Sequence, residues 1–204
     1  MKKFSAGPIV VALALACLSL SRPAAAQTTP KAEVSGGYQW AHFSGSDQSE
    51  SFNNGWFGDV AVNVKPHLAL VFQASGSYKT TTESASVGSA PLEATANLSA
   101  HQYLGGIRVN GRASKKVTPF AQFLVGAASL SAGGVVSGFF DGATHVTTAD
   151  GKAATHSALQ VGAGLNLMMS EKVGVRGVAD YGRIFNGDNG FNVFRTGIGI
   201  VFAF

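Results

Sequence analysis

The chain has 204 residues, of which 13% are charged and 26 are glycine. Charged residues make up roughly 25% of an ordinary soluble domain, so an ordinary soluble domain is disfavoured. The formal net charge is +4, but three of the fifteen basic residues and none of the eleven acids lie in residues 1–26. The remainder carries twelve basic residues against eleven acids, which gives no support to nucleic-acid binding.

The amino-terminal stretch predicts a secretory signal peptide. Residues 1–3 are Met-Lys-Lys, residues 9–20 are apolar, and Ala24, Ala25 and Ala26 precede Gln27. A basic start, a short apolar run and an Ala-x-Ala site are typical of such a peptide, and the apolar run is shorter than the roughly 20 residues of a membrane-spanning helix. We expect residues 1–26 to be cleaved. The only cysteine, Cys17, lies in a poor match to a lipidation site, so we favour the cleaved peptide.

The remaining chain, residues 27–204, alternates large apolar residues with small or polar ones in eight stretches. They cover residues 33–43, 55–65, 68–78, 98–110, 117–130, 155–168, 172–181 and 191–204. A period of two indicates β-strands, and about 9–11 residues suffice for a tilted strand to cross a membrane. The short connections are residues 66–67, 111–116 and 169–171. The long polar ones, residues 44–54, 79–96, 131–154 and 182–189, are predicted to be loops.

These features predict an all-β protein: an eight-stranded antiparallel up-and-down transmembrane β-barrel. No stretch after residue 26 has 18 uninterrupted apolar residues or a sustained 3.6-residue period. A barrel satisfies every backbone group within lipid, because closing the sheet leaves no unpaired edge.

The small or charged face of each strand is expected to point into the lumen. A basic residue facing lipid at mid-height would cost roughly 2–4 kcal/mol. We therefore predict a structural network of charges in the lumen, and we expect Asp180 and Arg195 to form an ion pair between neighbouring strands. The predicted network consists of Glu33, Asp59, Arg108, Arg176, Asp180 and Arg195.

Four segments carry a resemblance to a known family. They are FRTGIGIVFAF, VGVRGVADYG, VTPFAQFLVGAA and YLGGIRVNG, and the chain resembles the small eight-stranded outer-membrane β-barrels of Gram-negative bacteria, the OmpA/OmpX type. The resemblance implies contact with the outer-membrane lipid bilayer and lipopolysaccharide. It also implies that periplasmic chaperones and the barrel-assembly machinery act during biogenesis, with Phe202 and Phe204 as the assembly signal.

The resemblance implies a structural or surface-interaction role with long extracellular loops, whose external ligand the sequence does not identify. A small porin is one alternative. A lipid A-modifying enzyme using His156 and Ser157 is another, and a secreted lipocalin-type barrel is a third. We expect no enzyme activity, because no acid is placed to orient that pair. The other histidines lack metal-ligand spacing, so no metal or cofactor is expected.

Overall fold

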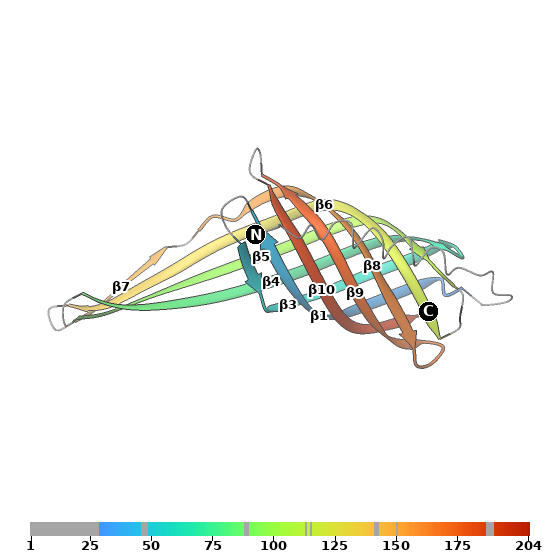
Figure 1. The fold of residues 1–204 in the computed structure, drawn as a ribbon, viewed down its shortest axis with the longest axis horizontal. Coiled ribbons are helices and arrows are strands. Elements are labelled where there is room, and N and C mark those ends of the chain that lie inside the picture. The colour runs from blue at the N-terminus through green and yellow to red at the C-terminus, as the bar shows by residue number, and fades with distance from the viewer. Residues whose placement is uncertain are drawn as a thin grey trace, which may run out of the picture.

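A computed structural model describes residues 29–45, 49–87, 90–112, 114, 116–140, 143–149, 151–186 and 190–204. The predicted signal peptide, residues 1–26, lies outside these ranges and stays a prediction. Ten strands form one antiparallel sheet (Figure 1). They are β1 (Ala32–Ser44), β2 (Ser49–Phe52), β3 (Asn54–Lys65), β4 (Leu68–Val87), β5 (Ala90–Asn110), β6 (Val117–Phe140), β7 (Ala143–Ala149), β8 (Ala154–Met168), β9 (Val173–Phe185) and β10 (Phe191–Ala203).

Eight of the strands close into a barrel. Their order is β1-β3-β4-β5-β6-β8-β9-β10, and β10 pairs back onto β1 from Glu33↔Ala203 to Ser44↔Asn192. Each strand therefore pairs with the barrel strands before and after it in the chain. This confirms the predicted eight-stranded antiparallel barrel. Within the described ranges, no helix is long and apolar enough to cross a membrane.

The strands β2 and β7 lengthen two barrel strands. β2 pairs with β1 from Ala41↔Phe52 to Ser44↔Ser49, just beyond the end of the β1–β3 pairing at Tyr38↔Trp56. β7 pairs with β6 beyond the point where the β6–β8 pairing ends. Each is thus an offset continuation of its neighbour in the chain, β3 and β8 respectively.

Two of the predicted loops are wrong, because strands run through them. β4, β5 and β6 have 20, 21 and 24 residues, about twice what a tilted spanning strand needs. Residues 79–87, 90–99 and 131–140 of these strands form with β7 a sheet that we call the extension. It projects well beyond the barrel (Figure 1). The other two predicted loops are shorter than expected, since one contains β2 and β9 continues to Phe185.

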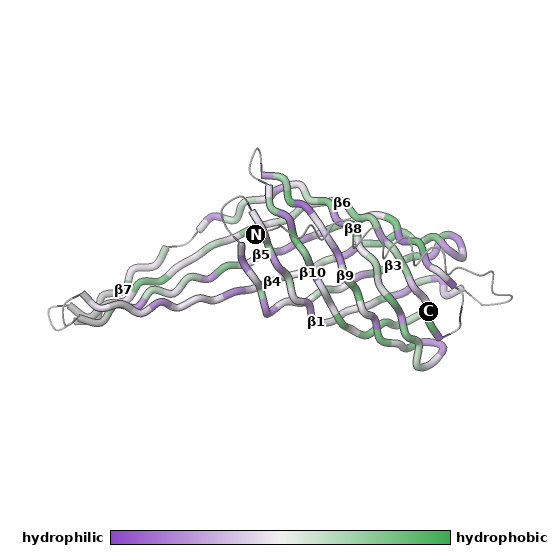
Figure 2. The backbone as a smooth tube through the Cα atoms, viewed as in Figure 1, coloured by the Kyte–Doolittle hydropathy of each residue, from purple (hydrophilic) through white to green (hydrophobic). Residues whose placement is uncertain are grey.

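Composition explains why the extension forms strands but lacks an apolar face. Its residues are mainly threonine, serine, alanine and valine, and Figure 2 shows it mostly pale where the barrel strands alternate between hydrophobic and hydrophilic. Threonine and valine favour strands, and cross-strand polar pairs stabilise them. Thr80 Oγ1 donates to Asn97 Oδ1 at 2.8 Å, and the hydroxyls of Thr82 and Thr95 are 3.2 Å apart.

The barrel has two unlike rims. We call the one with the short connections, where β1 begins and β10 ends, the turn rim, and the other the extension rim. Large apolar side chains cover the outer wall, which agrees with the predicted assignment of faces. The exposed ones include Tyr38, Val60, Leu70, Phe72, Tyr103, Ile107, Phe123, Leu165, Ile198, Ile200 and Phe202.

Candidate functional site

The six predicted lumen residues are all buried in the barrel interior, each at most 4% exposed. They come from β1, β3, β5, β9 and β10, and they point inward because successive residues of a strand face opposite sides of the sheet. The residues are Glu33, Asp59, Arg108, Arg176, Asp180 and Arg195.

Asp59 is the centre of one ion cluster. Arg176 Nη1 donates to both of its carboxylate oxygens, at 2.7 and 2.8 Å, and Arg108 Nη2 lies 3.1 Å from Oδ1. The Ser35 hydroxyl donates to Oδ2 at 2.6 Å. Each carboxylate oxygen thus meets at least two donors, which offsets the cost of removing the charge from water.

Glu33 extends this cluster towards the turn rim. Its Oε2 accepts from Arg176 Nη2 at 3.1 Å, and its Oε1 accepts from Arg112 Nη2 at 3.2 Å. Arg112 Nε also donates to the Pro66 carbonyl at 2.6 Å. Arg112 lies in the short connection predicted at residues 111–116, and its role was not predicted. That connection also contains Lys115 and Lys116, and nothing in its sequence distinguishes the arginine that folds back into the lumen.

Asp180 and Arg195 form the predicted ion pair, which is confirmed. They are directly opposite each other on β9 and β10, and Arg195 Nη2 lies 2.7 Å from Asp180 Oδ2. Arg195 also donates to Ser75 Oγ at 2.9 Å and to Gln73 Oε1 at 3.1 Å. The carboxylate is therefore held by a guanidinium that is itself anchored on the far wall of the barrel.

Gln122 joins the two clusters into one network. Its Oε1 accepts from Arg108 Nε and Nη2, and its Nε2 donates to Asp180 Oδ1 at 3.1 Å. Sequence reasoning from charge missed both Gln122 and Gln73. The available signal is alternation, since each occupies an inward position of its strand, and Gln73 lies directly opposite Asp59 and Gln122 directly opposite Arg108 on the neighbouring strands.

Aromatic and glycine residues fill the space around the charges. The guanidinium carbons of Arg108 and Arg176 lie 4.5 and 5.0 Å from the centre of the Phe120 ring. A Cβ on Gly164 would lie 2.5 Å from Cζ of that ring, and one on Gly162 would overlap the Asp180 carboxylate. Both glycines are therefore required by close approach.

Towards the extension rim, many inward side chains are large and apolar, which corrects the expectation that inward positions are small or polar. Leu104 and Leu124 are 1% and 0% exposed. Both belong to one cluster of buried apolar residues. That cluster includes Phe43, Phe52, Val71, Ala100, Ala128, Ala158, Ile184 and Val193. The interior thus changes from charged near the turn rim to largely apolar near the extension rim, where the buried Gln39, Ser77 and Gln102 are uncharged.

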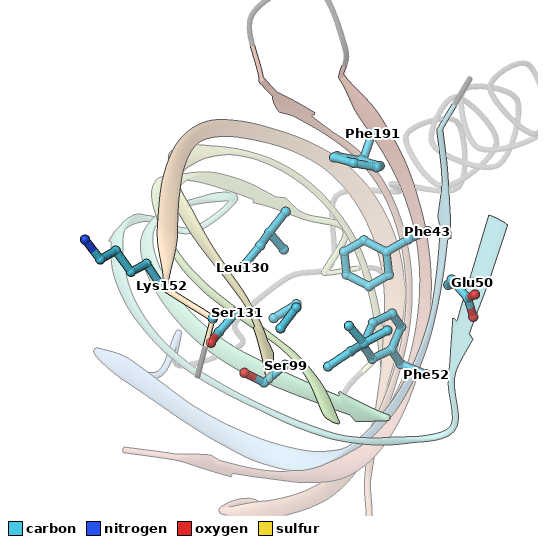
Figure 3. A pocket seen from close by; sticks show the side chains of 12 residues that line it. Phe43, Glu50, Phe52, Ser99, Leu130, Ser131, Lys152 and Phe191 are labelled. Carbon is cyan, nitrogen blue, oxygen red and sulfur yellow. The ribbon is translucent and has the colours of Figure 1, made fainter. Parts of the chain in front are cut away.

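A cavity of about 290 Å³ opens on this apolar half, and we call it the rim cavity (Figure 3). Five large apolar side chains from different segments line it: Phe43, Phe52, Leu98, Leu130 and Phe191. A second cavity of about 700 Å³ lies at the turn rim and has polar lining residues. Between the two, the described side chains pack the lumen.

The arrangement of His156 and Ser157 does not form a catalytic pair. They are consecutive on β8, where the histidine is partly buried and the serine is exposed, so they lie on opposite sides of the wall. A nucleophile and its base must lie within hydrogen-bond reach. Within the described ranges, no group of three or more histidine, cysteine or acidic residues is placed to hold a metal ion.

Comparison with protein families gives one match. The model described as "Outer membrane protein beta-barrel domain" covers residues 10–204. No curated protein matches the chain.

Solved structures match over most of the chain at low identity. Ail of Yersinia pestis, solved in complex with the heparin analogue sucrose octasulfate, is 13% identical, with a TM-score of 0.50 over 84% of this chain and 97% of Ail. Neisserial surface protein A is 11% identical, with a TM-score of 0.53 over 85% and 97%. OprG of Pseudomonas aeruginosa is 11% identical, with a TM-score of 0.51 over 86% and 96%. At these identities the likeness shows the fold alone.

Proposed function

This chain belongs to the outer membrane protein beta-barrel domain family, and from that premise we propose that it is a non-enzymatic surface protein whose extension makes contacts outside the cell. Its family implies the bacterial outer membrane as its location. The extension is the observation that carries the proposal.

The lengths of the strands support an orientation with the extension outside. The apolar band of an outer-membrane barrel is about 25 Å tall, and short connections face the periplasm while long ones face the exterior. The turn rim has only short connections, whereas β4, β5 and β6 continue far beyond the opposite rim. This orientation places lipopolysaccharide around the extension rim. The assembly machinery and periplasmic chaperones would act from the side of the turn rim.

The extension offers backbone groups to a partner. Beyond the Asn54↔Tyr78 pair, β4 has no described strand on its outer side, and β7 pairs only with β6 in the described sheet. Such edges present rows of N–H and C=O groups to which an extended peptide can add. A sheet of this length holds the edges well clear of the membrane.

The alternatives have less support. A porin needs an open lumen, but here buried charged side chains and buried apolar side chains fill the lumen. A lipid-modifying enzyme needs a nucleophile with an adjacent base, and His156 and Ser157 lie on opposite sides of β8.

The proposal is tested by shortening the extension without touching the barrel. In one variant, residues 80–97 are replaced by Asn-Gly, a favoured two-residue hairpin turn. A boiling-dependent shift on a detergent gel checks that the barrel still folds. Attachment of expressing cells to immobilised fibronectin, laminin, collagen and heparin is then measured, with heparin included because Ail was solved with a heparin analogue.

We expect the wild type to attach to at least one of these surfaces, and the shortened variant to attach no more than cells lacking the protein. A control variant with a two-residue insertion in the 169–171 turn changes a connection at the opposite rim and leaves the extension intact, so it should attach like the wild type. Equal attachment by the wild type and the shortened variant would overturn the proposal. An epitope tag inserted between Val87 and Ala90 tests the orientation. If antibodies do not bind this tag on intact cells, the proposal is also overturned.

A further inference from the structure

We propose that the rim cavity binds a small, uncharged, largely apolar molecule, of the class of a benzene ring or a short hydrocarbon bearing at most one hydrogen-bonding group. This goes beyond the surface role proposed for the extension. It does not depend on that role, because the cavity lies within the mouth of the barrel.

The walls of the cavity are built from parts of the chain that are distant in sequence. Phe43 of β1 and Phe52 of β2 pack with their ring centres 4.8 Å apart and their planes tilted by 56°. Both rings are buried, at 7% and 6% exposure. Leu130 of β6 and Phe191 of β10 complete the wall seen in Figure 3. Small-molecule sites are typically concave and lined by such side chains.

The floor of the cavity is closed. Leu98 and Leu130, which line the cavity, pack against the cluster that contains Leu104 and Leu124, and both of these are almost fully buried. The cluster borders the polar network, because Gln73, which accepts a hydrogen bond from Arg195, lies directly opposite Leu104. A molecule that enters from the extension rim therefore meets a blind end. That geometry is typical of a binding site rather than a passage.

Charged groups are placed away from the interior of the cavity. Glu50 lies at its edge and is ion-paired with Lys79. The Lys152 side chain extends away from the cavity in Figure 3. The remaining polar side chains in the lining are the hydroxyls of Ser99 and Ser131. An ion would lose hydration there without gaining a partner, whereas a neutral molecule would lose little.

The volume restricts the size of the ligand. Small-molecule sites commonly span about 300–1,000 Å³, so a cavity of about 290 Å³ is at the lower limit of that range. It suits a single ring or a short chain. Toluene is a suitable probe, and benzoate is its charged counterpart of similar shape.

The test is a titration of the folded barrel in lipid nanodiscs, with leucine methyl groups labelled for NMR. Toluene should shift the methyl signals of Leu98 and Leu130 along a saturating curve. The methyls of Leu165 and Leu167, which are exposed on the outer wall, should shift without saturation as toluene enters the lipid. Benzoate should shift neither pair along a saturating curve.

Filling the cavity supplies the second arm. Leu130→Trp should raise the half-saturating toluene concentration at least tenfold, as followed by the Leu98 methyls. Leu165→Trp is the same exchange on the outer wall and should leave that concentration unchanged. Cavity methyls that respond linearly, in parallel with Leu165, would overturn the proposal. Saturable binding of benzoate would overturn the assignment to uncharged ligands, whatever the variants do.

Discussion

Arg176 on β9 donates hydrogen bonds to both carboxylate oxygens of Asp59 on β3, although β10 and β1 separate these two strands in the sheet. The pair therefore crosses the lumen instead of following the hydrogen-bonded wall. It ties together parts of the barrel that the backbone ladder does not join directly.

The first prediction concerns that cross-lumen contact. Asp59→Asn leaves the buried guanidinium groups of Arg108 and Arg176 without their shared anion. Removing one partner of a buried ion pair typically costs about 3–5 kcal/mol. We expect the free energy of unfolding to fall by that amount in a urea titration of the refolded barrel. Glu50→Gln breaks the more exposed pair with Lys79 and should cost at most about 1 kcal/mol. Equal losses would contradict the argument.

A double-mutant cycle tests the pair between Asp180 and Arg195. Asp180→Asn and Arg195→Gln each leave an unpaired buried charge, so each should destabilise the barrel strongly. The double variant leaves no such charge, and it should lose clearly less stability than the two single losses together, with a coupling of about 1–3 kcal/mol. Additive losses in urea titrations would show that the 2.7 Å contact contributes nothing beyond the two separate groups.

Two glycines that neighbour each other on β8 and β9 should respond oppositely to alanine. A Cβ on Gly164 would lie 2.5 Å from Phe120 Cζ, whereas one on Gly177 would meet nothing within 4 Å. Gly164→Ala should cost about 1–3 kcal/mol through overpacking of the lumen. Gly177→Ala should be neutral or stabilising by up to about 1 kcal/mol, because alanine restricts the unfolded chain more. Thermal unfolding of the two variants, compared with the wild type, gives the measurement.

Ion conductance should require both layers of the lumen to be opened. Arg195→Ala alone should leave planar bilayers at the wild-type baseline, because the apolar layer at Leu104 and Leu124 still excludes water. Adding Leu104→Ser and Leu124→Ser should produce discrete channel openings. A wild-type protein that conducts steadily would show instead that the packed lumen rearranges, and would favour the porin alternative.

Phe204→Ala separates assembly from stability. The Phe204 side chain is 68% exposed, while its backbone N–H donates to the Ala32 carbonyl at 2.9 Å. The substitution keeps that backbone bond, so the refolded barrel should unfold at the wild-type urea concentration. If Phe204 belongs to the assembly signal, the amount of protein in the outer membrane should fall several-fold. Phe123→Ala, at another exposed phenylalanine, serves as the control and should not reduce it.

Period-two alternation was enough to predict the barrel, because lipid outside and packed side chains inside impose opposite demands on alternate residues. The sequence predicts loops at residues 79–96 and 131–154 because that contrast is missing there. In the extension, strands have no lipid on one side, so Thr82 and Thr95 can face each other without any apolar pattern. Strand propensity and hydroxyl pairs replace the hydrophobic signal.

The charged residues of the lumen network that lie on strands could be predicted from the sequence. Glu33, Asp59 and the arginines on strands were found because a charge in lipid is costly. Arg112 was missed because its chain position is a turn, and only the folded backbone brings it to Glu33. The apolar half of the lumen was missed for a different reason: inward leucines such as Leu124 alternate with outward apolar residues. A stretch that is apolar on both faces carries no period.

The seam between β1 and β10 has a consequence for how the barrel forms. It joins the two barrel strands that are farthest apart in the chain, from Glu33↔Ala203 to Ser44↔Asn192. Contacts between distant residues carry the largest loop-closure entropy and slow folding. Until β10 arrives, twelve residues of β1 keep one side of their backbone unpaired, at a cost of several kcal/mol for each group exposed to lipid. Strands therefore cannot enter the bilayer one by one as they are synthesised, and insertion and closure of the ring occur together.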